Sequence, residues 1–417
     1  MKKYNLIVAG GGLSGVAAAV SAARQGLQVL LIEKEGCLGG AMSNCLVYPF
    51  MKYWSGKRGD KDFRYLSAGI FTEMRERQKK YEFTSSDSDF KPEYFKLVLD
   101  DMVTEAGVDV LFHSTVFSAS TQGGQVKSVQ VLTKSGVLEF ESEFFVDATG
   151  DGELLALVGC DYQLGRESDG LCQPMTTCFR LSGVDLEQFK KDKPMLQELY
   201  KKYQAEGKIS NPRENILSMT GIGEGILHLN TTRVIRHDPT NAFDVSRAEI
   251  IARRQVYEMT AFLKQNSKAF ENSTIISIAT HIGVRESRKL KGVHILTAEE
   301  LKSCVSFDDT IALGNYEIDI HNPSGTGTEL YYFKEGEYYQ IPYRCLLPKE
   351  YNNMLVAGRS ISATHEAQAA VRIMPICACL GEAAGTAVGV AFHTGKTAHT
   401  VDVGTVRKLL IQNGAAL

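Results

Sequence analysis

YNLIVAGGGLSGVAAAVSAARQGLQVLLIE, residues 4–33, is the stretch that decides the fold of this chain. Leu6 to Ala9 is a short apolar run that is typical of a buried parallel strand. The small residues from Val16 to Arg24 predict a helix, which Gly26 ends. Val29 to Ile32 then predicts a second strand, so the order is strand, tight turn, helix, strand.

The turn carries glycines in the spacing G-x-G-x-x-G, at Gly10, Gly12 and Gly15. Gly10 permits the tight turn, Gly12 lets the backbone approach a pyrophosphate, and Gly15 allows close packing of helix and strand. The helix follows this turn, so its N-terminal N–H groups would face the phosphates. Glu33 ends the second strand, where an acid accepts hydrogen bonds from an adenosine ribose. The stretch therefore predicts a dinucleotide site.

The composition excludes several classes of protein and of binding partner. The chain has 417 residues, 44% of them hydrophobic and 23% charged, which is ordinary for a globular protein of two or three domains. A net charge of −3 gives no indication of nucleic acid or an anionic membrane as a partner. We expect neither a signal peptide nor a membrane-spanning run, and the nine scattered cysteines do not suggest a secreted disulfide framework. We therefore predict a cytoplasmic protein.

Three further segments match a site for a dinucleotide. Gly39 and Gly40 form a second glycine pair just beyond Lys34, with Ala41 after it. The run FFVDATGDG, residues 144–152, is an apolar strand with a small-residue end that can pass close to a cofactor. Met354 to Ala357 predicts a strand ending at Gly358, and a Gly/Ala-rich helix is expected from Ile376 to Val390. The N-terminus of that helix can stabilise negative charge on a bound cofactor.

Longer motifs resemble a bacterial family described as FAD-dependent oxidoreductases, related to the fumarate reductase flavoprotein group. They are GVRESR (283–288), DIH (319–321), IPYRCLLP (341–348), LVAGRSISATHEA (355–367) and RIMPICACLGEAAGTA (372–387). The resemblance covers nearly the whole chain and implies FAD as the cofactor. The residues that it and the glycine motifs assign to FAD are Gly10, Gly12, Leu13, Ser14, Gly15, Glu33, Lys34, Gly39, Gly40, Ala41, Val116, Thr149, Gly150, Asp151, Gly358, Arg359, Arg372, Ile373 and Met374. No histidine lies in residues 34–45, so we expect FAD to be bound non-covalently.

The resemblance also implies the fold class: α/β, with a Rossmann-type, glutathione-reductase-like FAD domain and an inserted mixed α+β substrate or cap domain. We expect residues 1–159 and 341–417 to form the FAD domain and 160–340 the cap, with 46–95 as a further contributor to the cap. Within the cap, residues 226–234 alternate as a strand with His228, Asn230 and Thr232 on one face. Ser246 and Glu249 predict a capping box at the start of a long helix.

Substrate binding requires cations or polar donors near the flavin ring. Arg285 and Arg288 are three residues apart, so on a helix they would share a face and suit an anionic substrate. Arg344 and His365 are further candidates, and His321 in the DIH motif is our first choice for a catalytic histidine. No Cys/His cluster has metal-ligand spacing, so no metal is predicted.

The predicted activity is hydride transfer between flavin N5 and a small polar or anionic organic substrate, with an electron donor or acceptor that the sequence does not identify. One alternative is a flavin monooxygenase that uses NAD(P)H and oxygen, although the W-x-W-x-I-P stretch of halogenases is absent, since Trp54 is the single tryptophan. Others are a non-enzymatic dinucleotide-binding protein, or a sulfur-handling reductase that uses Cys37 or Cys45. These thiols lack the C-x-x-x-x-C spacing of disulfide reductases. Homo-oligomerisation stays open.

Overall fold

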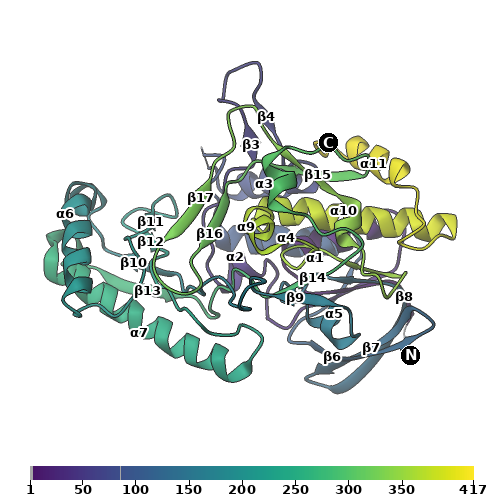
Figure 1. Ribbon diagram of the computed structural model, residues 1–417, viewed down its shortest axis with the longest axis horizontal. Coiled ribbons are helices and arrows are strands. Elements are labelled where there is room, and N and C mark those ends of the chain that lie inside the picture. Colours follow the sequence, from purple (N-terminus) through teal and green to yellow (C-terminus); the bar gives the residue numbers. More distant parts are fainter. Residues whose placement is uncertain (1–2, 85) are drawn as a thin grey trace.

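The computed structural model describes residues 3–84 and 86–417, and a seven-stranded mixed sheet forms its centre (Figure 1). The strands are β5 (Asp109–Leu111), β2 (Val29–Ile32), β1 (Lys3–Ala9), β8 (Gly136–Asp147), β7 (Gln125–Thr133) and β6 (Thr115–Gln122) in spatial order, with β19 (Met354–Val356) also on β8. Ala9 is level with Ile32 on one side and with Asp147 on the other. The carboxyl ends of these parallel strands therefore meet at one edge, where ligands of such sheets bind.

Two helices from opposite ends of the chain pack together beside this sheet. They are α1 (Leu13–Ala23) and α10 (Met374–Thr394). Their backbones approach closely, because a Cβ on Gly381 would lie 2.0 Å from Ser14 O and one on Gly385 would lie 2.1 Å from Ala18 O. The glycines of α10 thus bring the C-terminal helix against the predicted phosphate-binding helix.

Helix α10 is also long and apolar enough to cross a membrane by length and composition alone. The expectation that the chain has no such segment was wrong in this respect. In the structure, however, 94% of its most apolar window is buried by the rest of the protein. Its hydrophobicity is therefore explained by its place in the core.

Smaller elements cover the same core. They are α2 (Ala41–Asn44), α3 (Ile70–Tyr81), α4 (Pro92–Glu105), α5 (Glu153–Leu157), α9 (His365–Val371), α11 (Val403–Gln412), β3 (Trp54–Ser55) and β4 (Arg64–Tyr65). Phe50, Phe71 and Phe95 pack edge to face beside α4, whose first residue is Pro92. Residues from the 46–95 segment therefore share a core with the dinucleotide-type sheet.

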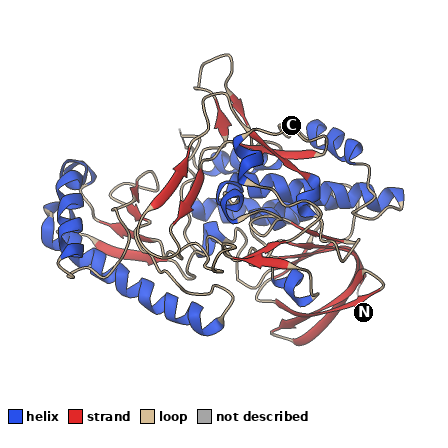
Figure 2. Cartoon of the chain, in the orientation of Figure 1, coloured by secondary structure: helices blue, strands red, loops and turns tan. Residues whose placement is uncertain are grey.

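A second, antiparallel sheet lies on the other side of the molecule, where α6 (Leu186–Ala205) and α7 (Ala242–Asn266) cover it (Figures 1 and 2). We call it the cap sheet. Its order is β11 (Ser218–Met219), β12 (Leu227–Leu229), β10 (Phe179–Ser182) and β13 (Thr274–Ile278), and η1 (Lys268–Phe270) follows α7. Phe179, Leu181, Leu227 and Leu229 form a separate core with the two helices. The opposite face of the sheet carries polar residues.

Short elements connect the two sheets. They are β9 (Tyr162–Leu164) with β14 (Arg288–Leu290), β15 (Thr310–Gly314) with β18 (Tyr339–Pro342), β16 (Ile318–His321) with β17 (Thr328–Tyr331), α8 (Ala298–Lys302) and η2 (Tyr343–Leu346). Ile311, Ile318 and Tyr339 belong to the same core as α1 and α10. This packing favours a shorter insertion than residues 160–340, and the domain division stays a prediction.

Two local predictions were wrong. The long helix begins at Ala242, with Asn241 as its N-cap, because the Asn241 side chain accepts from two backbone N–H groups. Ser246 lies inside the helix and donates to Ala242 O, so it forms no capping box. Arg288 begins strand β14, so it does not share a helical face with Arg285.

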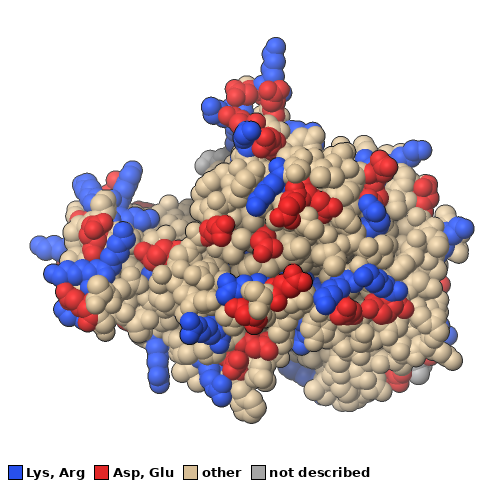
Figure 3. Space-filling model, in the orientation of Figure 1, with Lys and Arg blue, Asp and Glu red and all other residues tan. Residues whose placement is uncertain are grey.

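On the surface visible in Figure 3, positive and negative side chains are interspersed.

Candidate active site

The turn after β1 leaves backbone donors and one hydroxyl at the start of α1. Gly10 has a φ of +97°, and Gly12 is the N-cap of α1 without a side chain to bond the first N–H groups. The Ser14 hydroxyl is buried and has no hydrogen-bond partner among the described residues. Donors with this geometry suit a phosphate, which the dipole of α1 also attracts.

Glu33 is fixed at the end of β2 by two backbone donors. Its Oε2 accepts from Gly11 N at 2.6 Å and its Oε1 from Glu35 N at 2.8 Å. Burial raises the pKa of this carboxyl group, and the two N–H groups oppose that rise. Each oxygen keeps a further lone pair, so the acid can accept a ribose hydroxyl as predicted.

A cavity of about 350 Å³ extends from this corner along the sheet edge to the N-terminus of α10. It is lined by all of the predicted FAD residues except Gly15 and Ile373. Gly15 lies behind the turn, where a Cβ would sit 1.8 Å from Gly10 O, and Ile373 is the buried N-cap residue of α10. Both residues support the cavity wall from behind and do not face the cavity. A Cβ on Gly12 would meet only Gly40 Cα, at 3.9 Å, so this position faces open space.

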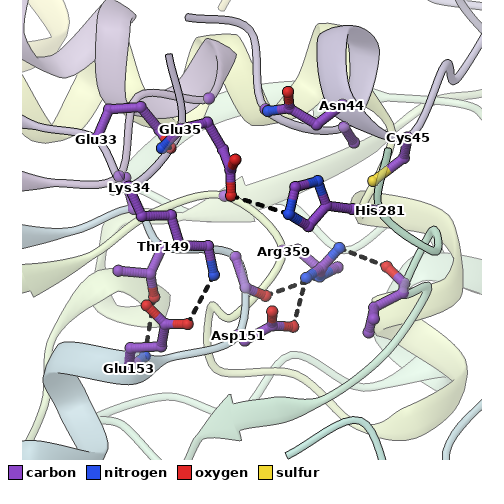
Figure 4. Close-up of a pocket in the computed structure, with 18 of the residues that line it drawn as sticks. Glu33, Lys34, Glu35, Asn44, Cys45, Thr149, Asp151, Glu153, His281 and Arg359 are labelled. Carbon is purple, nitrogen blue, oxygen red and sulfur yellow. Dashed lines mark hydrogen bonds and ion pairs between the residues drawn. The ribbon is translucent and has the colours of Figure 1, made fainter. Parts of the chain in front are cut away.

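Arg359 holds the Gly150–Asp151 segment against the loop before β14 (Figure 4). Its Nε donates to Gly150 O at 2.7 Å, its Nη2 bonds Asp151, and its Nη1 donates to Val284 O. Asp151 also accepts from the Ser287 hydroxyl at 2.7 Å. Because these partners satisfy the guanidinium, we infer that Arg359 shapes the cavity wall.

Two further side-chain contacts join segments that are distant in sequence across the cavity (Figure 4). Lys34 lies 2.9 Å from Glu153, and His281 lies 3.1 Å from Glu35. Other lining residues that sequence reasoning did not assign to the cofactor are Asn44, Cys45, Ser114, Thr115, Val245, Glu249 and Ile282. Asn44 and Cys45 follow the predicted glycine pair at once and could have been found from it. Val245 and Glu249 come from α7, and no local pattern indicated their position.

None of the five catalytic candidates lines the cavity. Arg344 is half-exposed and pairs with Asp309 on the surface. Arg288 donates to Asp151 O at 3.1 Å and lies over the Tyr162 ring. His365 is buried against Glu286, at 2.7 Å. These contacts favour structural roles for Arg288, His365 and Arg344.

His321 and Arg285 belong to a buried polar network behind the end of the cavity. His321 lies 3.0 Å from Arg233 through Nδ1 and 3.3 Å from Asp319 through Nε2. Burial and the charge of Arg285 lower the pKa of His321 to about 3, so the ring is neutral. Arg372, which does line the cavity, lies 3.5 Å from Asp319. His321 is therefore two contacts away from the lining residue Arg372, with Asp319 between them.

Arg285 donates to Pro174 O at 2.6 Å and to the Thr176 hydroxyl. Burial lowers the pKa of Arg285 to about 9, with the nearby charge of Arg372 acting in the same direction. The Nε of Arg372 is buried and has no partner among the described residues. Positive charge therefore gathers near the N-terminus of α10, where Met374 and Cys377 line the cavity.

Comparisons with known proteins agree with this geometry. The family model "FAD dependent oxidoreductase" matches residues 5–410. OxyS anhydrotetracycline hydroxylase from Streptomyces rimosus is 11% identical, with a TM-score of 0.50, and the match covers 99% of this chain and 66% of that chain. At this identity the similarity shows the fold alone.

Two other solved structures are more distant. A geranylgeranyl bacteriochlorophyll reductase-like protein from Thermoplasma acidophilum is 12% identical, with a TM-score of 0.47 and coverage of 100% and 85%. p-Nitrophenol 4-monooxygenase from Pseudomonas putida is 10% identical, with a TM-score of 0.49 and coverage of 100% and 87%. No curated protein matches the sequence. The family match, which spans nearly the whole chain, and the dinucleotide-shaped cavity lead to one conclusion: this chain belongs to the FAD dependent oxidoreductase family and is an enzyme that uses FAD.

Proposed function

We propose that this oxidoreductase exchanges a hydride between FAD and a small polar or anionic organic molecule. The observation that carries the proposal is the place of Arg372 on the cavity wall next to the N-terminus of α10, with a buried Nε that has no partner among the described residues. Ile373 gives that helix no side-chain cap. A free guanidinium donor and free helix N–H groups stabilise negative charge at the same place.

FAD, when bound, supplies the acceptance and return of a hydride. The residues of the chain itself bind and orient the substrate and stabilise negative charge. Arg372 and the first turn of α10 hold negative charge at this end of the cavity. Arg285, which remains a cation at neutral pH, adds to the positive field behind Val284, a lining residue.

The cysteines do not support the sulfur-handling alternative. Burial raises the pKa of Cys45 and of Cys377 to about 12, and it raises the pKa of Cys37 as well. The thiolate is the nucleophile in disulfide exchange, so these thiols are poor reactants near neutral pH. Cys37 and Cys45 are also unpaired thiols in the structure.

The proposal is tested on purified protein in two steps. Acid precipitation first shows whether flavin is released to the supernatant, as non-covalent binding requires. Anaerobic titration with small organic acids, alcohols and amides then measures bleaching of the flavin band. Bleaching without oxygen supports hydride transfer from that compound. Substrate-stimulated oxygen uptake driven by NADPH, without anaerobic bleaching, would instead favour the monooxygenase. No redox response under either condition would favour the non-enzymatic alternative.

A further inference from the structure

The polar face of the cap sheet holds a buried arginine without a partner. Arg180 on β10 is 7% exposed, and its Nε and Nη2 have no hydrogen-bond partner among the described residues. No ion pair to Arg180 is found in the part of the chain that the structure describes either. A buried guanidinium without a counter-charge costs several kcal/mol. Such a group therefore indicates a missing partner.

The two free atoms of Arg180 form one edge of the guanidinium. Elsewhere in this protein the same edge holds carboxylates. Arg166 binds Asp169 through Nε and Nη2 at 2.7 Å each. Arg344 binds Asp309 through the same two atoms, at 2.9 and 3.2 Å. Arg180 thus presents an edge suited to bidentate carboxylate binding that no carboxylate among the described residues uses.

A second free donor lies across from it. His228 on β12 is level with Arg180 in the antiparallel register, so the two side chains share a face. His228 is fully buried, and neither ring nitrogen has a partner among the described residues. Burial and the charge of Arg180 lower the pKa of His228 to about 3. The neutral ring carries one N–H group, which can donate to the same ligand.

Other neighbours keep this face polar without neutralising it. The Tyr48 ring lies 5.6 Å from the His228 ring, and its hydroxyl is already held by Asp89. Arg213, which is 4% exposed, leaves Nη1 without a partner among the described residues. The acids near this face are Asp89, which is held by Tyr48, and Glu93, whose charge opposes the fall in the pKa of Arg180 that burial causes without an ion pair between the two among the described residues.

The face is close to the end of the FAD cavity. Cys178, two residues before Arg180 on the same strand side, packs against Leu46 and Ala279. Leu46 follows Cys45, which lines the cavity. The positive charges of Arg285, Arg180 and Arg213 all act on the Cys178 thiol. Cys45, Leu46 and Cys178 therefore place the cationic face next to this end of the cavity.

We propose that Arg180 and His228 form a carboxylate-binding subsite that anchors the substrate of this oxidoreductase, which is therefore an organic acid. The inference rests on the proposed function, because it assigns the subsite to the molecule that exchanges a hydride with FAD. The carboxylate sits on Nε and Nη2 of Arg180 and accepts from the His228 ring.

The first test is the thermal stability of the holoprotein without added ligand. Arg180→Met removes the charge and keeps much of the side-chain length, and Arg254→Met on the exposed face of α7 is the matched control. An unpartnered buried charge predicts that Arg180→Met raises the melting temperature by several degrees, whereas Arg254→Met leaves it unchanged. A lower melting temperature for Arg180→Met would show that the arginine has a structural partner and would overturn the proposal.

The second test is binding, read from the flavin difference spectrum. Probes are propionate, benzoate and succinate, each compared with its amide, together with inorganic phosphate. We expect the acids to bind more tightly than the amides, and Arg180→Met to weaken the acids at least about tenfold without changing flavin content. Equal binding of acids and amides, a preference for phosphate, or no effect of the variant would overturn the subsite. Failure of the redox proposal is seen separately, as absence of anaerobic bleaching.

Discussion

Glu33 Oε2 lies 2.6 Å from Gly11 N, so the acid at the end of β2 is bonded to the turn at the end of β1. Its other oxygen accepts from Glu35 N. An amide offers one acceptor oxygen where the carboxylate offers two. Glu33→Gln should therefore destabilise even the flavin-free protein by about 1–3 kcal/mol, the cost of a buried donor left unsatisfied.

Thermal unfolding of the apoprotein measures this effect. Glu35→Gln is the control, since the Glu35 side chain contacts the partly exposed His281 and its backbone N–H is unchanged. If Glu33→Gln lowers flavin retention but leaves apoprotein stability intact, the bond to Gly11 contributes nothing to the fold.

Gly12 separates cofactor binding from folding. Its φ is −66°, which any residue adopts, and a Cβ there would meet only Gly40 Cα at 3.9 Å. Gly12→Ala should therefore fold normally and lose most of its flavin, because the methyl group occupies the place of the pyrophosphate. Gly15→Ala should fail to fold, since its Cβ would lie 1.8 Å from Gly10 O. Circular dichroism and the flavin-to-protein ratio report the two properties, and a fully flavinated Gly12→Ala would contradict the placement of the pyrophosphate.

Glu382 predicts an unusual dependence of stability on pH. It is 3% exposed on α10, its Oε2 accepts from Ile70 N at 3.1 Å, and burial raises its pKa to about 7. The pKa is higher in the folded than in the unfolded chain, so this group's contribution is complete below pH 4.5 and is lost as pH rises through 7. Glu382→Gln should thus stabilise the protein at pH 8 by up to about 3 kcal/mol, and should have little effect near pH 4.5.

The control variant for Glu382→Gln is Glu73→Gln, which should change the stability at neutral pH in the opposite direction. A hydrogen bond from Arg24 lowers the pKa of Glu73, so Glu73→Gln should destabilise the protein at neutral pH and lose that effect in acid. Denaturant unfolding at pH 8 and at a pH below 4.5 separates the two variants, because their effects have opposite signs at pH 8 and both fade in acid. Equal stabilisation by Glu382→Gln at both values would show that the carboxyl group does not titrate in this range.

Two arginines from the family motifs should behave differently. Arg344→Ala removes an exposed pair with Asp309, which is worth about 0–1 kcal/mol at most, so flavin content and turnover should be unchanged. Arg288→Ala removes the donor to Asp151 O and should lower flavin retention more than substrate affinity. If the variant loses substrate binding but keeps its full flavin content, Arg288 contacts the substrate and not the flavin site.

The thiols near the cavity should be dispensable. Cys45→Ser and Cys37→Ser should each retain flavin reduction, because burial raises the pKa of both groups and leaves little thiolate at neutral pH. Stopped-flow reduction with an identified substrate measures the rate. Loss of reduction in either variant would favour the sulfur-handling reductase.

The sequence signals for the proposed cofactor site are local. Gly10, Gly12 and Glu33 lie within one strand–turn–helix–strand unit, and the structure places them around one cavity. The catalytic candidates depend instead on long-range packing. His321 and Arg285 are held in a network whose partners come from other strands and loops, so motif membership did not indicate which side chains face the cavity.

The same limit explains why Arg180 was not assigned a role. The predicted strand over residues 226–234 is shorter in the structure, where β12 is Leu227–Leu229, so of the three polar residues only His228 lies on the strand. Its pairing with Arg180, however, depends on the register between β10 and β12, which only the folded chain defines. The predicted start of α7 was wrong for a simpler reason. Asn241 and Ser246 are both residue types that favour the N-cap position, and the folded chain uses the earlier one.

The contact between α1 and α10 has a consequence for how the protein matures in the cell. The Gln25 side chain reaches the Gly385 carbonyl, 360 positions later in the chain. Since a nascent chain emerges from its N-terminus, α1 and its glycine turn are synthesised long before the helix that completes their pocket. The first half of the flavin site must therefore persist on the ribosome without its second wall, and cofactor capture belongs to the last moments of translation or follows release.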